Sequence, residues 1–122
     1  MPSSSRSLRE AVRAIEGIDR SDAPILPFGI AAVDDRLASG GLRIDALHEC
    51  AGAAGGWGDD AAATLFLAGL AARGTGPVLW VARGRDLFAP GLYQAGLGPD
   101  RLIQVEARDD PELLAIMEDA LR

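Results

Sequence analysis

A glycine-rich run that ends on two carboxylates is the segment of this sequence with the clearest chemical implication. It contains four glycines and two aspartates: Gly52, Gly55, Gly56, Gly58, Asp59 and Asp60. Loops of the form G-x-x-x-x-G-K-[ST] cradle phosphates with backbone N–H groups, and their lysine and hydroxyl hold the phosphates and the magnesium ion. The run therefore has the glycines of a phosphate-binding loop, with acids where the lysine and hydroxyl belong.

The charges of this run argue against a bound nucleotide. Asp59 would repel a triphosphate. A lysine from elsewhere in the chain cannot take over the missing cation's role, because all 12 basic residues of the sequence are arginine. A carboxylate at a helix start is stabilised by the free N–H groups and the helix dipole. We therefore expect Asp59 or Asp60 to cap the next helix and to fill the anion position internally. The interpretation is a degenerate loop with no catalytic residue, no cofactor and no metal.

Two other groups of residues are candidate sites. His48 and Cys50, the single histidine and cysteine, would point to one face of a strand about 7 Å apart, too far for imidazole to activate a thiol. They make neither a disulfide nor a zinc site, so we expect both to be packing residues. Arg83 and Arg85 follow an apolar run and could receive an anion, but solvated charges paired to Asp86 are the favoured interpretation.

The elements that would position the glycine-rich run alternate between strand and helix. We expect a strand at Leu47–Ala51, a buried helix at Ala61–Arg73, a strand buried on both faces at Val78–Ala82 and a short helix at Leu87–Ala95. Then come a strand at Arg101–Ala107 and a helix capped by Asp110, with a buried stripe of Leu113, Leu114, Met117 and Leu121. This alternation predicts a parallel α/β sheet.

The N-terminal part of the sequence predicts a separate helix and a linker. A helix should run from Ser7 to Gly17, with Leu8, Val12 and Ile15 on one face. Asp19–Pro27 indicates a linker. A short helix within 28–37, with Ile30, Val33 and Leu37 inward, and a connector at Leu42–Asp45 would then lead into the sheet. We place the domain boundary between residues 22 and 23.

Composition restricts the class of protein. A net charge of −6, with 48% hydrophobic and 25% charged residues, is typical of a globular domain. It argues against a stand-alone nucleic-acid binder, so contact with DNA would be weak or through a partner. The sequence has neither a signal-peptide pattern nor an apolar run of membrane-spanning length. We expect a cytoplasmic protein without membrane contact.

Several motifs resemble a known family. Pro27-Phe28-Gly29, Val33-Asp34 and Gly40-Gly41-Leu42 are similar to the entry of RecA-type ATPase cores. Residues 85–92 and 99–103 resemble the ImuA family more narrowly. The resemblance implies a RecA-like three-layer αβα fold with a parallel sheet. Residues 23–122 would be the N-terminal half of such a domain, incomplete with its first three core strands.

The same resemblance implies a function. ImuA-like proteins would be non-catalytic accessories of damage-induced (SOS) error-prone translesion DNA synthesis, and their partners would be RecA and an ImuB-like homologue of Y-family polymerases. The resemblance supplies no site residue. Two alternatives stay open: an active RecA-like ATPase of recombination or repair, and a cell-division inhibitor resembling SulA. Self-association also stays open.

Overall fold

The computed structural model describes residues 7–12, 22–84 and 87–122. The chain divides into two compact units, Met1–His48 and Glu49–Arg122. Residues 7–12 are helical, as expected from Ser7 onward. The predicted end of that helix at Gly17 and the start of the predicted linker lie outside the described residues.

The first unit contains a small antiparallel strand pair that the sequence patterns did not predict. β1 (Ile25–Leu26) pairs with β2 (Leu42–Arg43), where we expected a linker and a connector. Strands of two residues show no measurable alternation, which explains the error. Gly41 is packed so tightly against β1 that a Cβ there would lie 2.5 Å from the side chain of Ile25.

Between these strands lie helix α2 (Ala31–Asp34) and the 3-10 turn η2 (Ala38–Gly40). The Asp34 carboxylate accepts hydrogen bonds from the N–H groups of Phe28 and Gly29 at 2.8 and 2.9 Å. The predicted helix is therefore present but short. Ile30 and Val33 are exposed, which contradicts their expected inward position, because a helix of four residues offers too little surface to bury them.

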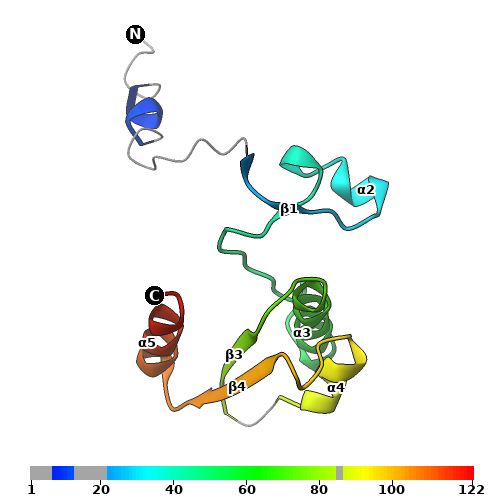
Figure 1. The fold of residues 1–122 in the computed structure, drawn as a ribbon, viewed down its shortest axis with the longest axis vertical. Helices are drawn as coiled ribbons and strands as arrows, with labels where there is room; N and C mark the ends of the chain where they lie inside the picture. Colours follow the sequence, from blue (N-terminus) through cyan, green and yellow to red (C-terminus); the bar gives the residue numbers. More distant parts are fainter. Residues whose placement is uncertain (1–6, 13–21, 85–86) are drawn as a thin grey trace. The chain divides into compact units, whose positions relative to one another are not determined.

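The second unit is a mixed α/β arrangement built on a parallel strand pair (Figure 1). Its elements are α3 (Trp57–Ala72), β3 (Val78–Arg83), α4 (Ala89–Gln94), β4 (Leu102–Ala107) and α5 (Asp110–Ala120). β3 and β4 are parallel, in the register that joins Val78 to Leu102 and Arg83 to Ala107. The parallel pairing and both strands confirm the sequence prediction. The two strands lie between α5 on one side and α3 with α4 on the other.

The strand predicted at Leu47–Ala51 is absent. These residues have no regular structure, and Leu47 is 93% exposed. A strand needs a neighbour for its N–H and C=O groups, yet β3 is bonded to β4 alone among the described strands. The wider three-layer RecA-like arrangement thus stays a prediction, because the observed parallel sheet has two strands.

Burial in the second unit is limited. Among its described residues, the fully buried apolar ones are Ala68 of α3, Leu92 of α4, Leu97 and Ala107. The predictions of a buried α3 and of a strand β3 buried on both faces are therefore wrong, since Ala68 alone is buried in α3 and Leu79 of β3 is exposed. A sheet of two strands can cover only part of the apolar surface of its helices.

Helix α5 begins at a well-formed cap, one residue earlier than expected. Asp109, not Asp110, is the N-cap, and its carboxylate accepts the Glu112 N–H at 2.9 Å. The Glu112 carboxylate in turn accepts the Arg108 N–H at 2.6 Å. This reciprocal pair resembles a capping box. The predicted stripe is wrong in part: Leu113 is half-buried, but Leu114, Met117 and Leu121 are exposed.

The cap makes the start of α5 sensitive to acid. Hydrogen bonds from the Arg108 side chain and backbone lower the pKa of Glu112. Because the folded-state pKa lies below the unfolded value, the cap contributes fully above the ordinary carboxyl pKa and is lost as pH falls through the lowered value. We expect helical circular dichroism to decline below about pH 4, and Glu112→Gln to remove part of that decline. Asp119→Asn, which changes a carboxyl outside the cap, should leave the acid profile unchanged.

Candidate functional site

The glycine-rich loop leads directly into α3. The helix starts at Trp57, with Gly56 as its N-cap, and thus four residues before the predicted start at Ala61. Gly55 and Gly56 have φ angles of 64° and 146°, a region that side chains with a Cβ rarely occupy. These two glycines are therefore required by the turn itself. The loop would need them whether or not it binds a ligand.

A carboxylate of α3 folds back onto the loop. Asp59 Oδ2 accepts a hydrogen bond from the Ala54 N–H at 3.0 Å. Gly52 approaches the same residue so closely that a Cβ there would lie 2.6 Å from the Asp59 Cβ. Neither Asp59 nor Asp60 is the helix cap, which corrects that prediction. Asp59 instead ties the loop to the first turn of the helix by accepting one of the loop's backbone N–H groups.

Asp60 is placed differently from its neighbour. Its backbone N–H donates to the Gly56 carbonyl at 2.9 Å, as part of the first helical turn, and the residue is exposed. Trp57 on the same turn is 95% exposed. Sequence reasoning did not single out Trp57, because an isolated tryptophan at a helix start gives no signal of its exposure. The loop therefore presents a carboxylate and an indole at its surface.

The Asp59 hydrogen bond gives a direct prediction. Replacing Asp59 with Ala removes the acceptor of the Ala54 N–H, and a hydrogen bond to a charged group at a half-exposed site contributes about 1 kcal/mol. The Ala54 amide of Asp59→Ala should consequently exchange with solvent about fivefold faster, measured by NMR hydrogen exchange. Asp60→Ala is the matched control, and equal acceleration in both variants would contradict the assignment.

The arginine pair after β3 is only partly described. Arg83 Nη1 donates to Asp110 Oδ1 at 2.8 Å, and this pairing raises the pKa of Arg83 above its ordinary value. The described partner of Arg83 is thus an acid of α5, whereas the sequence interpretation favoured Asp86. Arg85 and Asp86 lie outside the described residues. Because both members of the pair are exposed, the interaction contributes little to stability.

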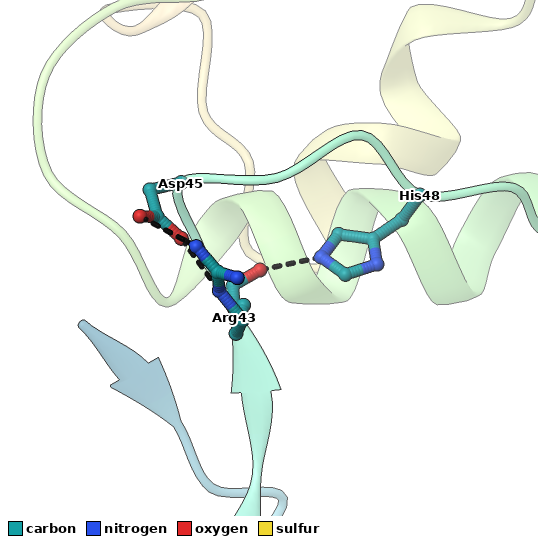
Figure 2. Close-up of polar contacts among 3 residues, drawn as sticks. All are labelled: Arg43, Asp45 and His48. Atoms are coloured by element: carbon teal, nitrogen blue, oxygen red, sulfur yellow. Dashed lines mark hydrogen bonds and ion pairs between the residues drawn. The ribbon is translucent and has the colours of Figure 1, made fainter. Parts of the chain in front are cut away.

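His48 belongs to a small polar group in the first unit. Its Nε2 donates to the Arg43 carbonyl, while the Arg43 guanidinium binds both oxygens of Asp45, with Nη2 to Oδ1 at 2.8 Å (Figure 2). His48 is exposed and Cys50 is half-buried, and neither is on a strand. The packing role predicted for His48 is therefore wrong. Its ring holds the turn after β2.

In residues 7–12, 22–84 and 87–122, His, Cys, Asp and Glu side chains nowhere gather in a group of three or more that could hold a metal ion. Within the same ranges, every helix is too short or too polar to cross a membrane.

Comparison with known proteins finds a clear similarity to two curated proteins. The chain is 43% identical over 113 residues to the protein named ImuA of Caulobacter vibrioides, in strain NA1000 / CB15N and in strain ATCC 19089 / CB 15. The match covers 88% of this chain and 46% of each relative, so the chain spans about half the length of the curated relatives it matches. No family model matches, and neither does any solved structure.

Proposed function

Because the chain belongs to the ImuA family, we propose that it acts in damage-induced mutagenesis as a non-catalytic accessory of error-prone translesion DNA synthesis. Its role would be exerted through protein–protein contacts, with RecA and an ImuB-like polymerase homologue as partners. The chain spans about half the length of its relatives. The proposed function is therefore that of the whole protein.

The glycine-rich loop is the observation that carries the non-catalytic part of this proposal. A phosphate-binding loop must offer free backbone N–H groups and a cation. Here the Ala54 N–H is engaged by the Asp59 carboxylate, and the sequence contains no lysine to supply the cation. A negative charge fixed at the loop would repel the phosphates of ATP. The loop thus favours a structural connection between the preceding segment and α3.

Exposed apolar side chains support a function through protein contacts. In the second unit the large side chains of Trp57, Phe88 and Leu121 are 95%, 73% and 87% exposed. Side chains this exposed are available for contact with another protein, and aromatic residues often contribute most of the binding energy at such contacts. The net charge of −6 further disfavours direct binding of nucleic acid as the main activity.

The test is association in the full-length protein. Affinity-tagged full-length protein, purified from cells after DNA damage, should retain RecA or the polymerase homologue, and Trp57→Ala or Phe88→Ala should reduce that retention several-fold. The matched control is Ala61→Ser, a small change at an exposed position of α3. Absence of both partners from the purified complex would refute the proposal.

Nucleotide binding provides a second measurement on the same preparation. We expect no magnesium-dependent binding of ATP by equilibrium dialysis. Saturable binding that is lost when magnesium is removed would instead support the ATPase alternative. An effect on the assembly of tubulin-like division filaments would support the SulA-like alternative.

A further inference from the structure

We draw no further inference here: the strongest candidate, the exposed apolar stripe of Leu114, Met117 and Leu121 along α5, carries none, because nothing in the structure shows what covers it and the acids beside it, Asp110 and Glu118, are already paired with arginines.

Discussion

Leu97→Ala should lower the free energy of unfolding by about 2–5 kcal/mol, the range observed when a fully buried leucine is truncated. Leu97 is 0% exposed and its N–H donates to the Leu92 carbonyl at 3.0 Å, at the point where the chain leaves α4. Leu97 and Leu92 are the largest fully buried side chains of the described residues, and the core around them is small. Such a core has few neighbouring side chains that can relax into the cavity left by the leucine. We therefore expect the free energy of unfolding to fall far enough to unfold much of the second unit.

The measurement is urea unfolding followed by the fluorescence of Trp80 in β3, in a Trp57→Phe background. Leu114→Ala is the matched control: the same truncation at a side chain that is 65% exposed should change the free energy of unfolding by less than about 0.5 kcal/mol. A difference of under about 1 kcal/mol between the two variants would contradict the observed core.

Arg101→Ala should be the second most damaging substitution, at about 2–3 kcal/mol. The Arg101 guanidinium donates to the carbonyls of Ala71, Ala72 and Gly76 at 3.0, 3.1 and 2.8 Å. Two of these carbonyls are at the C-terminal end of α3, where a cation is favoured by the helix dipole. The Ala71 carbonyl also accepts the Gly74 N–H at 3.2 Å. One side chain from the start of β4 therefore holds the end of α3 and the turn into β3.

Arg101→Lys tests the geometry of this contact. Lysine retains the charge but cannot present three donors in a planar fork, so it should recover less than half of the stability lost in Arg101→Ala. Arg122→Ala, which removes an exposed ion pair with Glu118, should have a much smaller effect. Full recovery with lysine would mean that charge alone, and not the fork of hydrogen bonds, stabilises the end of α3.

The second half of the fold could be predicted because its signals are local. The apolar run Val78–Ala82 and the acid-proline start of α5 each determine an element within a few residues, and both elements are present. The β1–β2 pair could not be predicted, because pairing of Ile25 with Arg43 is a contact across 18 residues between strands too short to show periodicity.

Burial was predicted less well than secondary structure. Amphipathic spacing shows which side chains of α5 share a face, but burial depends on how much surface the neighbouring elements provide. Leu113 lies half-buried, whereas Leu114 and Met117 remain exposed on the same helix.

At the glycine-rich loop, the prediction that Asp59 or Asp60 caps the following helix was wrong. Capping rules consider N–H groups of the helix itself. Asp59 accepts from the Ala54 N–H instead, across a turn in which Gly55 and Gly56 have positive φ angles. Side-chain spacing alone does not encode such a turn.

The link between Asp59 and the Ala54 N–H also limits which substitutions could create a nucleotide site. An Asp59→Lys change would place an ammonium donor against an amide donor, so the lysine of a nucleotide site would disrupt this loop before any phosphate could bind. A nucleotide site here would require the lysine, a hydroxyl at position 60 and a rearranged turn together. A loop that depends on its own carboxylate therefore has few single-substitution routes to such a site.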